Sequence, residues 1–131
     1  MLVAALKVAH ALPPNMLSGE FRFHSRGGVR HVYQTGKTIR TKELSLVFAP
    51  NERGFQRHAV VVSRRISKLA VIRNRIRRRV YEAIRLELAA NPDFRALKQD
   101  FVFVVYSKSL ETLDFTKLRS LISYLIQQSM L

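Results

Sequence analysis

The chain has 131 residues and 47% hydrophobic residues, which allows one domain with a hydrophobic core and excludes a disordered tail. It carries 23 Lys and Arg against 9 Asp and Glu, a formal net charge of +14. The lack of cysteine excludes disulfides and thiolate metal sites, and no stretch reaches the roughly 20 apolar residues of a membrane span.

The N-terminus, MLVAALKVAHALPP, is partly apolar, but Lys7 and His10 interrupt the apolar run and no A-x-A-like cleavage site follows. These features disfavour a secretory signal. Pro13 and Pro14 then separate this segment from the rest of the chain. We therefore expect an N-terminal extension, residues 1–20, followed by a single domain, residues 21–131.

The first predicted helix lies in VRHVYQTG (29–36), where apolar residues recur at helical spacing until a glycine ends the pattern. The run ELSLVFAP (43–50) predicts a strand, because Leu44, Leu46 and Phe48 alternate with Ser45 and Val47. A β-branched run, HAVVVS (58–63), predicts another strand, and an extra one is expected near residues 38–41.

From about residue 69 to 89 the period becomes helical, since apolar residues recur every fourth position at Ile72, Ile76, Val80, Ile84 and Leu88. Asn91 and Pro92 end this helix. The run FVFVVY (101–106) predicts an interior strand, apolar on both faces. Asp114 is an expected N-cap for a last helix. The order of elements indicates an α+β fold with one core.

Basic charge is concentrated in residues 1–80, with 17 basic and 3 acidic side chains, and peaks in RNRIRRR (73–79). A helical wheel places Ile76 on the core face and the following residues on the opposite face: Arg73, Asn74, Arg77, Arg78 and Arg85. Such a run is often only a solvated surface. Arginine suits phosphate, however, no glutamate is spaced to neutralise the run, and Glu82 is expected to meet only Arg78 or Arg79. We therefore expect a polyanion partner, with nucleic acid favoured over an anionic membrane.

Asn74 is a poor helix former in mid-helix, and its amide can donate and accept hydrogen bonds. It is either a tolerated surface residue or a contact to RNA or to a metal-bound water. No acid pairs with a histidine at a catalytic spacing, so no catalytic or metal-binding residue is predicted. His24, His31 and His58 are expected to lie at the surface or to face RNA.

The run VVVSRRISKLAVIRNRIRRRVYEAIR (60–85) resembles the signature of the bacterial ribonuclease P protein family. That signature has a strand ending in serine, two basic residues, a small residue and a lysine, an apolar run, and Arg-Asn-Arg leading a basic helix. Its elements stand here at Ser63, Arg64, Arg65, Ser67, Lys68, Arg73, Asn74, Arg75, Arg77 and Arg78. The resemblance runs from about residue 21 to the C-terminus.

The resemblance implies a small α-β sandwich ordered αβββαβα, with a mixed sheet and a left-handed βαβ crossover, against the general right-handed rule. It also implies a subunit of a cytoplasmic ribonucleoprotein that removes the 5′ leader from precursor tRNA. In that enzyme a catalytic RNA, carrying most of the bound Mg²⁺, performs the hydrolysis. The implied partners are this RNA and precursor tRNA, with no membrane. We expect the isolated protein to be monomeric and inactive.

The implied contacts to the catalytic RNA are Arg64, Arg65, Lys68, Arg73, Asn74, Arg75, Arg77 and Arg78. The implied leader-binding cleft, between the first helix and the sheet, is lined by Val29, Tyr33, Ser45, Val47 and Val61. The family usually has an aromatic residue at Val29, so Tyr33 is expected to be the only cleft residue that stacks. Tyr81 replaces a common basic residue, which weakens a phosphate contact or substitutes stacking for it.

Three alternatives remain open at this stage. Val29 and Tyr33 can simply pack the first helix onto the core. The chain can be a ribosomal or other structural RNA-binding domain, which the RNA that copurifies with it would reveal. It can also be an independent basic nuclease, whose activity would survive the removal of all RNA.

Overall fold

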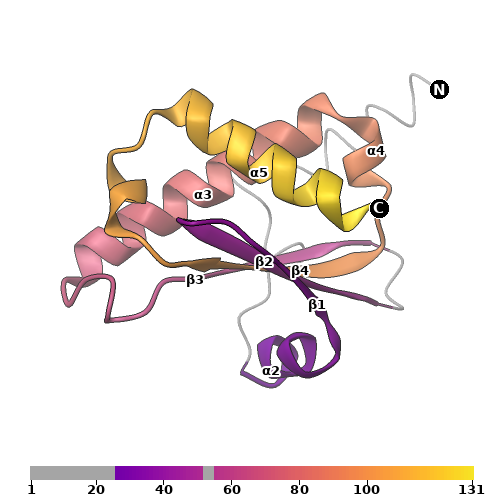
Figure 1. Ribbon diagram of the computed structural model, residues 1–131, viewed down its shortest axis with the longest axis horizontal. Coiled ribbons are helices and arrows are strands. Elements are labelled where there is room, and N and C mark those ends of the chain that lie inside the picture. Colours follow the sequence, from indigo (N-terminus) through magenta and orange to yellow (C-terminus); the bar gives the residue numbers. More distant parts are fainter. Residues whose placement is uncertain (1–25, 52–54) are drawn as a thin grey trace.

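The computed structural model describes residues 26–51 and 55–131. The expected extension at residues 1–20 and His24 lie outside the described residues. The domain has three layers (Figure 1). Helix α2 (Arg26–Thr35) lies on one face of a sheet, and helices α3 (Ala70–Ala90) and α5 (Phe115–Ser129) lie on the other.

The sheet has four strands in the order β1-β2-β4-β3. They are β1 (Lys37–Arg40), β2 (Leu44–Pro50), β3 (Arg57–Val61) and β4 (Gln99–Val105). Strand β2 pairs antiparallel with β1 and β4, whereas β3 and β4 are parallel. The predicted α+β class, mixed sheet and order αβββαβα are confirmed. The left-handed crossover between β3 and β4 stays a prediction.

Two short helices were not predicted from the sequence. Helix α4 (Pro92–Arg95) begins directly after α3, at the proline that was expected only to end the long helix. A 3₁₀ helix, η2 (Lys108–Glu111), follows β4, and the Ser107 hydroxyl caps it by accepting a hydrogen bond from the Ser109 amide. The predicted cap of α5 is confirmed, because the Asp114 carboxylate accepts a hydrogen bond from the Lys117 amide at 3.3 Å.

The predicted alternation of β2 separates two clusters of buried residues. Leu44 and Leu46 belong to a large core under α3 and α5, and Phe48 packs against it. Val47 belongs to a smaller cluster under α2. The predicted stripe of α3 also faces the large core: Ile76, Val80, Ile84 and Leu88 are buried, and Ile72 packs against them.

Tyr81 lies in this large core, with 8% of its surface exposed. The expectation that it replaces a phosphate contact with stacking on RNA is therefore wrong. Its position follows from the helix geometry, because Tyr81 adjoins Val80 and lies one turn after Arg77, on the border between the two faces of α3.

His58 is also a correction, since it was expected at the surface or facing RNA but is fully buried. Its ring stacks on Phe101 and Phe103, with centroid separations of 5.3 and 6.4 Å, and its Nε2 lies 2.6 Å from Gln56 Oε1. Burial, only partly offset by the charge of Asp100, lowers the pKa of His58 to about 3. The imidazole is therefore neutral in the folded protein at physiological pH.

Candidate nucleic-acid interface

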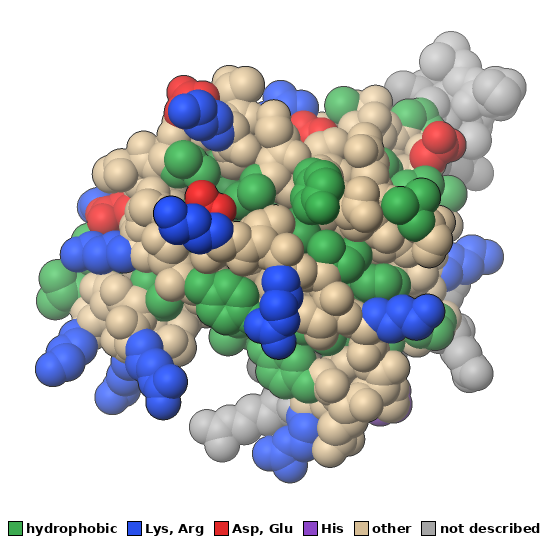
Figure 2. All heavy atoms as spheres, in the orientation of Figure 1, with side chains coloured by type: hydrophobic (Ala, Val, Ile, Leu, Met, Phe, Trp, Pro, Cys, Tyr) green, Lys and Arg blue, Asp and Glu red, His purple; other side chains and the backbone are tan. Residues whose placement is uncertain are grey.

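The loop between β3 and α3 and the exposed side of α3 carry six basic side chains that have no acidic partner among the described residues. We call them the basic face: Arg64, Arg65, Lys68, Arg73, Arg77 and Arg78. Figure 2 shows basic side chains projecting at the lower left, where Figure 1 places this loop and the start of α3. The partly buried Ile66, which packs against the large core, anchors the loop.

Other arginines of the same helix have structural partners. Arg75 forms an ion pair with Glu111 of η2, with Nη1 and Oε2 2.5 Å apart. Arg79 donates hydrogen bonds to the carbonyl groups of Leu110 and Leu113, and its guanidinium lies 5.9 Å from the ring centroid of Phe115. These two arginines therefore fasten the segment after β4 to α3. Arg75, an implied RNA contact, is still half exposed, with 54% of its side chain accessible.

Four of the nine acidic side chains are already paired with arginines. Glu82 pairs with Arg85 at 2.6 Å, so the expectation that it could meet only Arg78 or Arg79 is wrong. Glu87, Asp100 and Glu111 also pair with arginines. Because these carboxylates are used elsewhere, the positive charge of the basic face is left uncompensated within the described protein.

Three hydrogen bonds organise the start of α3. Arg73 Nη1 donates to the carbonyl groups of Ser67 and Lys68, at 2.9 and 3.1 Å, and so ties the loop to the helix. Asn74 Oδ1 accepts a hydrogen bond from Arg77 Nη1 at 2.5 Å. Asn74 is exposed, and this contact orients the guanidinium of Arg77 across one turn. Asn74 thus arranges the basic face; its predicted contact to RNA or to a metal-bound water stays a prediction.

Helix α2 sits close to the sheet at its C-terminal end. Val32 is fully buried in the smaller cluster, and the Gly36 amide donates to the Val32 carbonyl at 2.7 Å. A Cβ at Gly36 would lie 2.5 Å from the Val32 carbonyl oxygen and 2.6 Å from that of Phe48. Glycine is therefore required by the close approach of two backbone segments.

The five residues implied to line the leader-binding cleft all lie on α2 or on the sheet face that α2 covers, but their exposure differs. Tyr33 is 46% exposed, and Val29 and Val61 are half-buried. Ser45 and Val47 are buried. The structure thus brings these residues to one face, while two of them lie beneath the surface.

Reasoning from the sequence missed two residues on this face, Tyr106 and Arg40. Tyr106 is 45% exposed, and its hydroxyl accepts hydrogen bonds from Ser45 Oγ at 2.8 Å and Arg40 Nη1 at 3.5 Å. Partial burial, together with the neighbouring Tyr106, raises the pKa of Tyr33. Tyr106 thus adds a second half-exposed aromatic ring to this face, and the stacking expected of Tyr33 stays a prediction. Val102, Val104 and Tyr106 stand at every second position, so an extended strand places them on the same face. This alternation could have revealed Tyr106.

The loop of the basic face and Tyr106 both follow strands that end at one edge of the sheet. Strands β3 and β4 are parallel and both end there, with Val61 opposite Val104. The basic loop follows β3, and Tyr106 follows β4. Arg40 lies opposite Ser45, and Ser45 lies opposite Val104, so one row of residues crosses all four strands at this edge. A polyanion on the basic face can therefore continue onto the α2 face without crossing the core.

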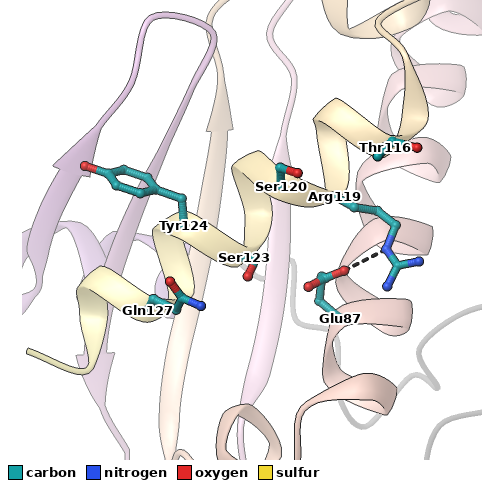
Figure 3. A pocket seen from close by; sticks show the side chains of 7 residues that line it. All are labelled: Glu87, Thr116, Arg119, Ser120, Ser123, Tyr124 and Gln127. Carbon is teal, nitrogen blue, oxygen red and sulfur yellow. Dashed lines mark hydrogen bonds and ion pairs between the residues drawn. The ribbon is translucent and has the colours of Figure 1, made fainter.

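A separate hollow of about 370 Å³ lies on the opposite side of the sheet, along α5 (Figure 3). Arg119 points toward α3, where its Nε lies 2.6 Å from Glu87 Oε2, and Tyr124 points the other way. The rest of the lining is uncharged and polar: Thr116, Ser120, Ser123 and Gln127. Because Glu87 neutralises Arg119, this hollow does not extend the basic face.

Within residues 26–51 and 55–131, no three His, Asp or Glu side chains gather closely enough to hold a metal ion. In the same part of the chain, none of the helices combines the length and the apolar character needed to cross a bilayer.

Comparison with known proteins places these features in a family. A family model described as Ribonuclease P matches residues 17–129. The ribonuclease P protein component of Roseiflexus castenholzii is 36% identical over 109 residues, covering 83% of this chain and 85% of that protein. Two solved structures share the fold. The RNase P protein of Staphylococcus aureus has a TM-score of 0.69 at 15% identity, covering 83% of this chain and 94% of the other. The RNase P protein of Thermotoga maritima, in complex with 1-(4-fluorophenyl)-2-thiourea, has a TM-score of 0.68 at 24% identity. This match covers 81% of this chain and 98% of the other.

Proposed function

The chain belongs to the ribonuclease P protein family and has the role of a subunit of that tRNA-processing enzyme, and we propose how it acts there. In this proposal the basic face binds the catalytic RNA subunit, and the α2 face of the sheet takes the single-stranded 5′ leader of precursor tRNA. The protein then positions the substrate, and the RNA subunit performs the hydrolysis in the cytoplasm.

The observation that carries the proposal is the contrast among the basic side chains. Arg57, Arg75, Arg85 and Arg119 each have an acidic partner, whereas the six residues of the basic face have none among the described residues. Like charges in such density are stabilised by a polyanion. Arg77 and Arg78 lie on the exposed side of a helix whose other side is fixed by Ile76. A rigid helix of this kind suits the bidentate recognition of phosphates.

The leader is assigned to the α2 face because that face combines apolar and polar groups at an accessible edge. Val61 and Val104 are half-buried there, beside the two exposed tyrosines and Arg40. Single-stranded RNA is bound by stacking of its bases and by cations along its backbone. The edge also adjoins the basic loop, so the leader and the RNA subunit can contact the protein at neighbouring sites.

We place the chemistry on the RNA subunit and its Mg²⁺ because no three His, Asp or Glu side chains of the described protein gather to hold a metal ion. The carboxylates of Glu82, Glu87, Asp100 and Glu111 are held by arginines in separate places. His58 is neutral and buried in the core, remote from solvent. Mg²⁺ favours oxygen ligands, which the phosphates of an RNA supply.

The test is reconstitution of the full chain with a bacterial ribonuclease P RNA and precursor tRNA at low Mg²⁺. We expect removal of the leader when both subunits are present, and little or none with either subunit alone at the same Mg²⁺ concentration. Equal cleavage with and without the protein would contradict a subunit role. Matured tRNA from the protein alone, after removal of all RNA, would place a catalytic group in the protein.

A second measurement separates this role from structural RNA binding. The full chain is purified from bacterial cells with its bound RNA, and that RNA is sequenced. One large non-ribosomal RNA is expected. Recovery of ribosomal RNA in its place would favour a ribosomal binding protein.

A further inference from the structure

The edge of the α2 face carries a second half-exposed tyrosine whose position is constrained. Tyr106 follows the last residue of β4, and its amide donates to the Glu43 carbonyl at 2.9 Å. The hydroxyl at the other end of the side chain accepts a hydrogen bond from Ser45 at 2.8 Å. The ring is therefore held at both its backbone and its tip, while 45% of the residue remains exposed.

Ser45 explains why this ring is held. Ser45 is fully buried near the start of β2, on the face otherwise occupied by Val47 and Ala49. A buried hydroxyl costs folding free energy unless it has a hydrogen-bond partner. Tyr106 supplies that partner, so the bond between Ser45 and Tyr106 contributes to folding and at the same time restricts the ring.

Tyr33 and Tyr106 are both about half exposed on the α2 side of the sheet. Val32, the residue before Tyr33, and Val104, two residues before Tyr106, pack in the same cluster under α2. Partial burial, and to a smaller extent Tyr106, raises the pKa of Tyr33, in agreement with this packing. Among the described residues, neither ring stacks on another aromatic ring. Both rings are therefore free to stack on a ligand.

We propose that Tyr33 and Tyr106 together form a stacking site for one unpaired nucleobase of the leader, with Ser45 as the positioning residue of Tyr106. The inference rests on the proposed function, because it assigns a nucleotide to the same face. Arg40 lies beside the Tyr106 hydroxyl and is exposed, so it can contact the phosphate next to that base.

The chemistry of this edge matches a nucleotide better than an apolar peptide. Two ring faces and the partly exposed Val61 and Val104 offer apolar surface, the tyrosine hydroxyls offer hydrogen bonds to a base edge, and Arg40 offers a cation. Because Tyr106 is already held by Ser45, stacking on it costs less conformational entropy than stacking on a free side chain.

The test uses the reconstituted holoenzyme and precursor tRNAs that each carry one abasic nucleotide in the leader. With the wild-type protein, an abasic nucleotide at one position should weaken binding by about 5- to 150-fold, the range for the loss of one stacked base. Tyr106→Ala should weaken binding of the intact leader, and the same abasic nucleotide should then cause little further loss. Tyr106→Phe keeps the ring but loses the bond to Ser45, so it should weaken binding less than Tyr106→Ala does and about as much as Ser45→Ala does.

Tyr124→Ala is the matched control, since Tyr124 is 48% exposed but lies on α5, across the sheet. It should leave the abasic profile unchanged. Ser45→Ala should weaken binding of the intact leader in the wild-type background but not in the Tyr106→Phe background, because no hydroxyl remains to be positioned. Melting curves of all variants show whether each protein is folded.

Two outcomes separate the inference from the function on which it rests. If the wild type binds long leaders more tightly than a leaderless tRNA, and Tyr106→Ala leaves every leader affinity unchanged, the stacking site is wrong while the proposed function stands. If the wild type binds leaderless tRNA as tightly as precursor tRNA, the assignment of the leader to the α2 face fails as well.

Discussion

The two faces of the sheet differ in how completely they are covered. The face under α3 and α5 holds the large core, which includes the fully buried rings of Phe101 and Phe103 and the apolar side of the 21-residue α3. The smaller cluster under α2 holds five buried hydrophobic residues, all valine or alanine, and the covering helix has ten residues. Most of the apolar burial that stabilises the domain therefore lies on one face.

This difference teaches how a small domain can combine stability with an accessible binding surface. The α3 and α5 face is packed and closed, and Arg79 and Arg119 on it are paired with carbonyl groups or an acid. The edge of the α2 face keeps two exposed tyrosines and lies next to unpaired basic side chains. Stability and binding thus depend on different residues, and substitutions should separate them.

The largest expected effect follows from placing a charge in the large core. Ile76→Asp should unfold the domain, because Ile76 is fully buried and an unpaired buried carboxylate costs several kcal/mol of the roughly 5–15 kcal/mol that stabilises a domain. Thermal melting followed by circular dichroism measures this loss of stability. Val71→Asp is the matched control, since Val71 lies on the same helix but is 60% exposed, and it should melt nearly as the wild type does.

A substitution at the junction of α2 and the sheet should have a smaller effect on stability and a specific effect on the leader. In Gly36→Ala the added Cβ meets two backbone carbonyl groups, so α2 must shift, at a cost of about 1–3 kcal/mol. Leader-dependent affinity should fall, while binding of the catalytic RNA is retained. Unchanged affinity for both long-leader and leaderless tRNA would show that the docking of α2 does not matter for the leader.

Acid should destabilise the closed face through His58. Its pKa is about 3 in the folded protein against an ordinary value of 6.5, so below pH 6.5 the unfolded chain binds a proton that the folded protein excludes. The contribution is fully present above pH 6.5 and is lost progressively as the pH falls toward 3. About 2 kcal/mol should be lost between pH 7 and pH 5.

Urea unfolding at several pH values measures how the free energy of unfolding changes with pH. His58→Gln is the control because glutamine does not titrate. Between pH 7 and pH 5, the free energy of unfolding of the variant should change less with pH than that of the wild type. The difference should correspond to about one bound proton. If the wild type and the variant share the same slope, His58 does not carry the effect.

The smallest effect on folding is expected at the basic face. Arg77→Ala combined with Arg78→Ala should leave the melting temperature unchanged but weaken binding to the catalytic RNA, and should reduce the salt slope of log K by up to about two units. This pair is preferable to Arg73, which also holds the loop before α3. Lys98→Ala combined with Lys117→Ala removes the same charge from other exposed positions and should leave the slope nearly unchanged.

Much of the fold could be predicted because it depends on local periodicity. The alternation in β2 and the four-residue repeat in α3 identified both the elements and their buried sides. His58 shows the limit of this reasoning. It lies two residues before Val60 in β3, so its side chain points to the same face, toward the large core. Residue type alone suggested a surface position. Only the neighbouring Phe101 and Phe103 and the side chain of Gln56 make its burial possible.

The candidate site was predictable in part, for a related reason. The arginines of α3 could be identified from the sequence. The sequence did not show which of them have partners within the protein and which do not. Arg75 and Arg79 are taken by η2 and by the segment after it, which are about 30 residues away in the chain. Tyr106 was missed because its importance depends on Ser45 and Tyr33, which lie on other elements.

The sequence by itself determined the positive charge, the strands and helices, the anchor at Ile76 and the resemblance to a ribonuclease P protein, because each is a local pattern of residue types. Only the tertiary structure decided which arginines remain unpaired, that His58 is buried and neutral, and that Tyr106 joins Tyr33 at the edge of the sheet. These features depend on strand order and on the parallel pairing of β3 with β4. That pairing brings together the ends of strands that are far apart in the chain.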